Sequence, residues 1–524
     1  MKKLLSILFS LCILIGLSSG CSNEHKGNNA SSPQTDSKQK LKVFTFGDTT
    51  FNPENSEPDI NPHRDSSGWA AVRYGVGETL FRYSESMGIE PWLAKSYELV
   101  NEKTWKITFR DNISFTSGRP MDAEAVKECL EALVKNHPRA AGNLHISNIV
   151  ADGQTVTITT EVPVPSLPNY LADPYGSIFD VRAGITPEGI INATGPYKAV
   201  SLISGERIEL VKNENYWNGK PKIDKIVVRT IKDGDTMTMA LQSGEIDAAY
   251  GMPYASYPLF QNEKFKFTSV STSRAFFLWM NFKDSITKDP AVRKAIAMGI
   301  NKEVFVNKLL NGNGYPAVGV FPDSFVFGNK SVSTEKYDPE AAKKVLEDAG
   351  WKDTDGDGVR EKDGKKLVIR WLTYPSRQEL PVLAESAQAT LKEIGIAVDI
   401  NNTADHNKII TDLAAWNVYA SAMITAPTGD PEYFFTYATL DSSSANKGHY
   451  HSNKHEELAK KMSKTFDLKE RERLAVQMQQ TILDDNAYVF VSHLRMSMIH
   501  KSNITGLVAH PSDFYEITVN LDIK

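Results

Sequence analysis

Three histidines stand close together towards the C-terminal end of the chain, at a spacing that is typical of metal ligands. His449, His451 and His455 lie in GHYHSNKHEE, and residues four apart, such as His451 and His455, share one face of a helix. Imidazole is a common ligand of Zn²⁺ and Ni²⁺. The same segment also reads as a solvated stretch before a helix, so both interpretations stay open.

An acidic segment offers a second kind of metal chemistry. DTDGDGVREKDG, residues 353–364, resembles a calcium loop through Asp353, Asp355 and Asp357. A full helix-loop-helix site has Glu at its twelfth position, where this chain has Gly364. The pattern therefore favours a solvated connector, with weak Ca²⁺ binding as the alternative.

Nothing in the sequence indicates catalysis. It contains no G-x-S-x-G, no H-E-x-x-H and no closely paired Cys and His, the patterns typical of a secreted hydrolase. We therefore expect a binding protein rather than an enzyme.

The start of the chain has the build of a secretory signal over residues 1–20. Two lysines precede an apolar run that ends at Leu17, and small residues lead into Cys21. The run is shorter than the roughly 20 residues that a membrane-spanning helix needs. We expect Cys21 to become the lipidated first residue, with an ordinary signal peptide as the alternative. Residues 21–40, rich in Ser, Asn, Gln and Lys, then form a flexible tether on the extracytoplasmic side of the cell membrane.

Composition limits the kinds of ligand and cross-link that the protein can have. The 524 residues are enough for two or three domain-sized cores, and their net charge of -5 without a basic block argues against nucleic acid. Once the signal is removed and Cys21 is lipidated, Cys129 has no partner for a disulfide. Aromatic residues make up 10% of the chain, enough for a core and for a ligand cleft.

Hydrophobic periodicity indicates alternating strands and helices. Apolar alternation predicts strands at residues 41–48, 104–113, 155–162, 224–231 and 366–374. Helical spacing predicts helices at residues 123–136, 291–300, 339–350, 380–395 and 455–466. The pattern is that of an α/β protein with mixed sheets.

One long motif and several short ones follow in a distinctive order. The long motif is FRDNISFTSGRPMDAEAV, residues 109–126; the short ones include TGPY (194–197), NENYWNGKPKIDKI (213–226), FFLWMNF (276–282), YDPEAAKKVLEDAGW (337–351) and GDPEYFF (429–435). In this order they resemble the nickel and oligopeptide substrate-binding proteins of ABC importers, extracellular solute-binding protein family 5. Most of these motifs mark turns and helix ends, such as the Gly195-Pro196 turn, so they identify the fold more than the ligand.

This resemblance implies a two-lobed, periplasmic-binding-protein-like α/β fold of the large class, with an extra subdomain and a hinge that closes on a solute. Lobe I is expected over residues 41–275 with an inserted subdomain at about 80–215. Lobe II is expected over residues 276–490, and residues 491–524 return to lobe I. The partner is expected to be the transmembrane subunits of an ABC permease, and the protein a monomer.

The resemblance also implies candidate metal ligands at both ends of the chain. His63 ends NPH in the loop after the first strand, a position that faces the cleft in this family. His510 lies in VAHPSDFYEI, in the segment expected to return to the same lobe. Both are candidate ligands of a chelated metal such as Ni²⁺. The alternative is that they are polar loop residues that only form hydrogen bonds.

A chelated metal usually carries carboxylates, which a guanidinium binds in a bidentate manner. Arg377, in TYPSRQELP at a strand-to-helix turn, is the first candidate. Arg139 resembles an arginine region of nickel binders, whereas the second such stretch is absent from residues 171–181. Candidate aromatic walls, each of which is also a candidate for the core, are Trp371, Tyr374, Tyr74, Tyr175 and Trp69.

We therefore expect a lipid-anchored substrate-binding protein of an ABC importer that captures nickel, or another transition metal, as a small-molecule chelate. The Ni(II) chelate, with a ligand such as histidine, is then the cargo, and no intrinsic cofactor is expected. The alternative is an oligopeptide or dipeptide binder, for which Asp430 in GDPEYFF is a candidate partner of the peptide amino terminus. A pheromone or adhesion lipoprotein on the same scaffold would share these features.

Overall fold

The computed structural model describes residues 41–48, 59–64, 67–507 and 509–524. The predicted signal, the tether and Cys21 lie outside the described residues. Within the described part, no helix combines the length and the apolar character needed to cross a membrane.

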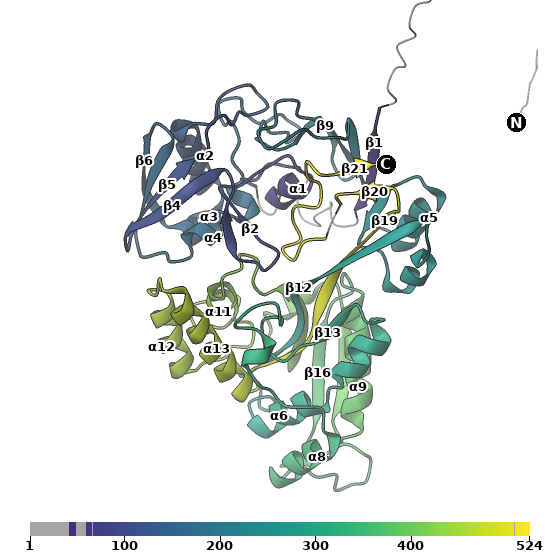
Figure 1. The fold of residues 1–524 in the computed structure, drawn as a ribbon. Coiled ribbons are helices and arrows are strands. Elements are labelled where there is room, and N and C mark those ends of the chain that lie inside the picture. Colours follow the sequence, from purple (N-terminus) through teal and green to yellow (C-terminus); the bar gives the residue numbers. More distant parts are fainter. Residues whose placement is uncertain (1–40, 49–58, 65–66, 508) are drawn as a thin grey trace, which may run out of the picture. The chain divides into compact units, whose positions relative to one another are not determined.

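A mixed sheet of 11 strands organises the described chain (Figure 1). Its order is β17-β16-β18-β12-β19-β11-β1-β10-β9-β8, with β13 attached to β19. The strands are β1 (Val43–Asp48), β8 (Tyr197–Ile203), β9 (Arg207–Lys212), β10 (Lys225–Thr230), β11 (Ala248–Tyr250), β12 (Phe265–Met280), β13 (Gly314–Pro316), β16 (Val368–Thr373), β17 (Ala397–Asn402), β18 (Val418–Ile424) and β19 (Tyr488–Lys501).

A second sheet of 4 strands is antiparallel, in the order β4-β5-β7-β6. Its strands are β4 (Ala94–Asn101), β5 (Thr104–Phe109), β6 (Ile146–Asp152) and β7 (Thr155–Thr160). The helix α2 (Ala123–Asn136) packs on it and begins at Asp122, whose carboxylate accepts the Ala125 N–H at 2.9 Å. Two-stranded pairs are β2 (Phe81–Tyr83) with β3 (Ile89–Pro91), β14 (Glu361–Lys362) with β15 (Lys365–Lys366), and β20 (Ile504–Thr505) with β21 (Asp522–Ile523).

Helices α6 (Pro290–Gly299), α8 (Pro339–Asp348) and α9 (Glu379–Lys392) gather near β16 and bury one hydrophobic cluster (Figure 1). The remaining α-helices are α1 (Gly68–Arg73), α3 (Pro138–Leu144), α4 (Leu167–Tyr170), α5 (Gly234–Ser243), α7 (Lys302–Val304), α10 (His406–Ile409), α11 (Glu432–Ala438), α12 (Asn453–Met462) and α13 (Leu468–Asp484). The five strands and five helices predicted from periodicity are confirmed as β1, β5, β7, β10, β16, α2, α6, α8, α9 and α12.

The long strands β12 and β19 lie side by side, and their antiparallel pairing is interrupted (Figure 1). The register shifts between Ser271 and Ala275. At the break the Thr272 hydroxyl donates to the Leu494 carbonyl at 2.9 Å, and the Ser273 carbonyl accepts the Thr425 N–H at 2.8 Å. Residues 272–274 thus leave the ladder with β19, and the Ser273 backbone is hydrogen-bonded to Thr425 instead.

A buried guanidinium joins the two ends of the described chain. Arg73, at the end of α1, is only 2% exposed. It forms ion pairs with Asp48 of β1 at 3.0 Å, with Asp513 at 2.7 Å and with Glu516 at 3.1 Å. It also donates two hydrogen bonds to the Asp513 carbonyl. The first strand and the C-terminal segment are therefore held by one side chain.

Replacing Arg73 with Met tests this junction. The variant removes the Arg73 charge from the buried Asp48 and Glu516 carboxylates, so we expect the free energy of unfolding to fall by about 3–5 kcal/mol. Equilibrium urea unfolding measures the change. The control is Arg207→Ala, which removes a surface pair with Glu206 and should cost about 1 kcal/mol or less. A loss no greater than that of the control would contradict the junction.

Candidate functional site

A cavity of about 680 Å³ lies beside the break in β12. Most of its walls come from four places: β12 with β19, residues 250–257, the turn at residues 375–379, and the C-terminal residues Pro511 and Asp513. Lys232, Gly234, Asn313 and Ile424 complete the lining. Segments far apart in the sequence therefore share one hollow, as expected for a ligand site.

Positive charge is in excess on the cavity walls. The acidic lining residues are Glu379 and Asp513, and both are already engaged: Tyr254 donates its hydroxyl to Glu379, and Arg73 binds Asp513. The cationic lining residues are Lys232, Arg274, Arg377 and Arg495. The cavity therefore suits an anionic ligand or one that carries carboxylates.

Two of these arginines influence one another. The Arg274 side chain is 18% exposed, and its Nη2 lies 3.8 Å from Asp513 Oδ2. Burial, followed by the positive charge of Arg377, lowers the pKa of Arg274. Among the described residues, the Arg377 guanidinium has no hydrogen-bond or ion-pair partner. The cavity wall thus carries two like charges, which an anionic group of a ligand would stabilise.

The structure places Arg377 on the cavity wall, in the turn between β16 and α9. Tyr374 directly follows that strand and stacks on His406 with ring centroids 4.2 Å apart. Trp371 is fully buried in the hydrophobic cluster under α9, and Tyr74 is fully buried with its hydroxyl donating to Asp48 at 2.9 Å. Trp69 lies against the guanidinium of Arg73, 4.3 Å away.

Arg139 and Tyr175 form a separate group that does not line this cavity. The guanidinium of Arg139 binds Asp173 through two hydrogen bonds of 2.8 and 3.2 Å and lies 4.7 Å from the Tyr175 ring centroid. Tyr175 is 1% exposed and accepts a hydrogen bond from Asn143. This arginine is therefore already paired with a protein carboxylate.

The two candidate metal ligands, His63 and His510, occupy different surroundings. The His63 ring lies 4.8 Å from Phe179, with Nε2 3.9 Å from the Cys129 sulfur. Burial, with a smaller effect of His137, lowers the pKa of His63 to about 4. His510 packs edge-on against Tyr515, and burial followed by Arg82 lowers its pKa to about 4. Both imidazoles are therefore neutral at physiological pH, the form that binds metals.

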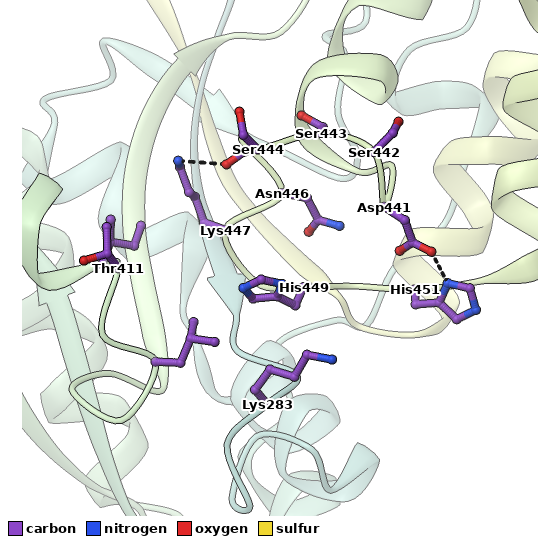
Figure 2. Close-up of a pocket in the computed structure, with 12 residues that line it drawn as sticks. Lys283, Thr411, Asp441, Ser442, Ser443, Ser444, Asn446, Lys447, His449 and His451 are labelled. Atoms are coloured by element: carbon purple, nitrogen blue, oxygen red, sulfur yellow. Dashed lines mark hydrogen bonds and ion pairs between the residues drawn. The ribbon is translucent and has the colours of Figure 1, made fainter.

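The histidine trio does not converge. His455 points into the core, where its Nε2 lies 2.6 Å from the Thr439 hydroxyl, because it sits on the inward face of α12. His449 and His451 instead line a different hollow of about 700 Å³, and His451 binds Asp441 at 2.6 Å (Figure 2). The i,i+4 spacing is present, but its two members face opposite environments.

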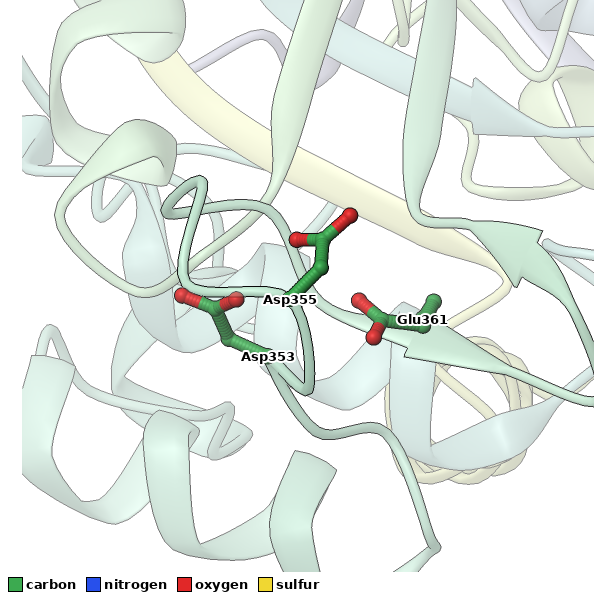
Figure 3. A group of neighbouring side chains, drawn as sticks. All are labelled: Asp353, Asp355 and Glu361. Atoms are coloured by element: carbon green, nitrogen blue, oxygen red, sulfur yellow. The ribbon is translucent and has the colours of Figure 1, made fainter.

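The acidic loop brings three carboxylates together (Figure 3). Ligand atoms of Asp353, Asp355 and Glu361 lie within 4.8 Å of one another, the one such group among the described residues. Glu361 is the ninth residue of the loop. The calcium-loop pattern requires Glu only at the twelfth position, so it does not identify Glu361. Lys366 already supplies a cation, because it pairs with Asp355 at 3.0 Å and with Asp357.

Asp430, the candidate partner of a peptide amino terminus, is buried against α13. Arg471 binds its two carboxylate oxygens at 2.6 and 3.2 Å and also contacts Glu432 at 2.7 Å. Arg274, Arg495 and Glu379 were not singled out from the sequence. The one available signal was the polar Arg274, two residues before the apolar run FFLWMNF.

Comparisons with known proteins agree with this architecture. The model of the bacterial extracellular solute-binding proteins, family 5 Middle, matches residues 88–446. The nickel-binding protein NikA of Staphylococcus aureus (strain NCTC 8325 / PS 47) is 29% identical over 455 residues, which cover 86% of this chain and 90% of that protein. The oligopeptide-binding protein AppA of Bacillus subtilis (strain 168) is 28% identical over 335 residues, or 62% of this chain and 61% of AppA.

Solved structures give the same result. The crystal structure of NikA from Staphylococcus aureus in complex with Ni(L-His)2 superposes with a TM-score of 0.76 and 27% identity, covering 92% of this chain and 100% of that chain. The predicted fold class, a two-lobed periplasmic-binding-protein-like α/β fold, is confirmed.

The lowered pKa of His63 predicts a pH dependence of stability. The ordinary value of 6.5 applies to the unfolded chain, whereas the folded value is about 4. Between these values the unfolded chain binds more protons, so stability is complete above pH 6.5 and falls as the pH decreases, by up to about 1.4 kcal/mol per pH unit. We expect His63→Gln to reduce the slope of the unfolding free energy between pH 6.5 and 4, measured by urea unfolding. An unchanged slope would show that His63 titrates normally in the folded protein.

Proposed function

Because the chain belongs to the bacterial extracellular solute-binding proteins of family 5, we propose that it captures nickel, or another transition metal, as a small-molecule chelate and delivers it to an ABC permease. The members of this family bind solutes for ABC importers and are not enzymes, so the predicted class of protein is confirmed.

The excess of positive charge in the cavity carries the proposal. A metal chelate of amino acids presents carboxylates outward, and each hydrogen bond between a guanidinium and a carboxylate contributes about 1.5–3 kcal/mol. Arg377 is available for such a bond, because its guanidinium has no partner among the described residues. The nickel-binding relative supports the choice of metal.

A peptide is the second candidate, supported by the oligopeptide-binding relative. A peptide also carries a carboxylate for Arg377, but its amino terminus needs an acidic partner. Asp430 is poorly suited to that role, because both of its oxygens are bound by Arg471. This contact favours the chelate.

The other site residues predicted from the sequence do not line the cavity itself, and they are proposed as further contacts around the chelate. His63 and His510 are neutral imidazoles suited to a metal. A ligand carboxylate at Arg139 would share the guanidinium with Asp173, with Tyr175 beside it. Tyr374 would border the site next to Arg377, while the buried Trp371 and Tyr74 would shape its walls from within the core.

The break in β12 supports the proposed lobe boundaries at residues 275 and 490. Lobe I would comprise residues 41–275, with an inserted subdomain at about 80–215, and residues 491–524. Lobe II would comprise residues 276–490. Strands β12 and β19 would then form the hinge, because each passes a boundary near the register shift between Ser271 and Ala275.

We also propose that the protein is a lipid-anchored monomer outside the cytoplasm. The support comes from the signal-like residues 1–20, from Cys21 and from the polar stretch that follows. An anchored binder would stay beside the transmembrane subunits of its permease.

Thermal unfolding of the protein without residues 1–21 tests the proposed cargo. We expect Ni²⁺ with free L-histidine to raise the melting temperature, because a ligand at 100 times its Kd adds about 2.7 kcal/mol of stability. Mixed short peptides should leave it unchanged, and Ni²⁺ alone and histidine alone are the controls. Stabilisation by peptides without any by nickel and histidine would reverse the assignment in favour of the peptide binder.

Single substitutions test the two histidines. We expect His63→Ala and His510→Ala to weaken the binding of nickel with histidine by about tenfold or more, since each removes a candidate ligand of the metal. Isothermal titration calorimetry measures the affinity. His451→Ala, which alters an exposed histidine paired with Asp441, is the matched control. Unchanged affinity in either variant would remove that histidine from the site.

A further inference from the structure

Two segments far apart in the sequence meet beside α4. The Asn169 side-chain amide donates to the Thr428 carbonyl, 259 positions away, at 2.8 Å. The Ser166 hydroxyl donates to Glu432 and accepts from Arg471, each at 3.3 Å. In Figure 1, α4 belongs to the upper part of the molecule, whereas α11 and α13, which carry Glu432 and Arg471, belong to the lower part. Within the proposed boundaries, these contacts therefore join the inserted subdomain to lobe II at a place other than the hinge strands.

Gly429 allows the two segments to approach so closely. Its φ of +68° lies in the left-handed region, and a Cβ at this position would collide with the carbonyl oxygen of Met87. Met87 lies in the turn between β2 and β3, within the proposed inserted subdomain. Because the obstacle is backbone rather than a flexible side chain, a larger residue at position 429 would hold the two segments apart.

The contacts between these segments are chemically suited to breaking and forming again. Residues 166–169 contribute a neutral hydroxyl and a neutral amide. The charged groups on the other side pair with one another, at 2.6 Å between Arg471 and Asp430 and at 2.7 Å between Arg471 and Glu432. Moving the segments apart therefore leaves these charges with their partners, which avoids the high cost of an unpaired buried charge.

We propose that these contacts form a latch that keeps part of the ligand-free population closed and thereby sets the affinity for the solute without touching it. The latch consists of Met87, Ser166, Asn169, Thr428, Gly429 and Arg471. None of these six residues lines the cavity of about 680 Å³, so the latch forms independently of contacts with the ligand. A ligand that needs the closed form binds with an apparent affinity reduced by the fraction of closed molecules, so a weaker latch means weaker binding. The inference rests on the proposed lobe boundaries and holds for a chelate or a peptide alike.

Small-angle X-ray scattering of the ligand-free protein tests the latch directly. Leu41–Lys524 form one compact unit, so the protein without residues 1–21 is suitable. We expect Gly429→Ala to shift the radius of gyration above that of the wild-type protein, because the Met87 carbonyl then blocks closure. Gly184→Ala is the matched control: Gly184 has a similar φ of +74°, but a Cβ there has no neighbour within 4 Å. An equal radius for the wild-type protein and Gly429→Ala, or an equal increase in both variants, would overturn the proposal.

Binding kinetics test the link between the latch and the affinity. Asn169→Ala removes one hydrogen bond of the latch without a backbone collision, so it covers the case in which Gly429→Ala folds poorly. We expect Asn169→Ala to raise the dissociation rate constant of nickel with L-histidine by about 2- to 10-fold, while the association rate constant does not fall. Stopped-flow tryptophan fluorescence measures both constants.

The kinetic outcomes separate the latch from other roles of Asn169. A folding defect would lower the fraction of active protein and leave the dissociation rate constant unchanged, and that result would overturn the proposal. A fall in the association rate constant alone would overturn it as well, because it would indicate a contact with the entering ligand. If the wild-type protein does not bind nickel with L-histidine, the proposed cargo fails, whereas the scattering experiment still decides whether the latch exists.

Discussion

The buried ion cluster around Arg73 is the interaction on which the rest of the structure depends. One guanidinium binds carboxylates from the first strand and from the C-terminal segment, so residues near the two ends of the described chain meet in one place. Removing these charges from water is costly, and it is offset only because every group has an opposite charge or a hydrogen bond nearby. The cost is apparent at Glu516. Burial raises the pKa of its carboxyl group well above the usual value, although the positive charge of Arg73 opposes this shift.

The same cluster determines the charge of the cavity. Asp513 lines the cavity and is committed to Arg73, while Glu379 is committed to the Tyr254 hydroxyl. Both acidic residues of the lining are thus engaged mainly by other groups than Arg274 and Arg377. The excess of positive charge in the cavity follows from how the fold uses its own acidic residues, more than from the number of arginines present.

Local sequence patterns were sufficient for the regular elements named above and for the position of Arg377 in a strand-to-helix turn. They were insufficient for Arg274, since the break in β12 depends on pairing with residues more than 200 positions away. The histidine trio shows the same limit. The spacing of His451 and His455 is that of one helix face, but α12 begins only at Asn453, and its packing buries His455. The sequence around Asp430 likewise gives no sign of a partner, because Arg471, which binds it, comes from the later helix α13.

The contacts of Arg471 also show how a hinged binder can stay both stable and mobile. Arg471, Asp430 and Glu432 pair their charges within the segment from 430 to 471, whereas the contact with the neighbouring segment is made by the neutral Ser166 hydroxyl, 3.3 Å from Arg471 and Glu432. Asn169 adds a second neutral contact, a 2.8 Å hydrogen bond to the Thr428 carbonyl. Separating these segments would break hydrogen bonds of about 0.5–3 kcal/mol each and would leave the buried ion pairs intact. Such a contact is weak enough for the binding of a ligand to decide whether it forms, because a good ligand supplies more free energy than the contact contributes.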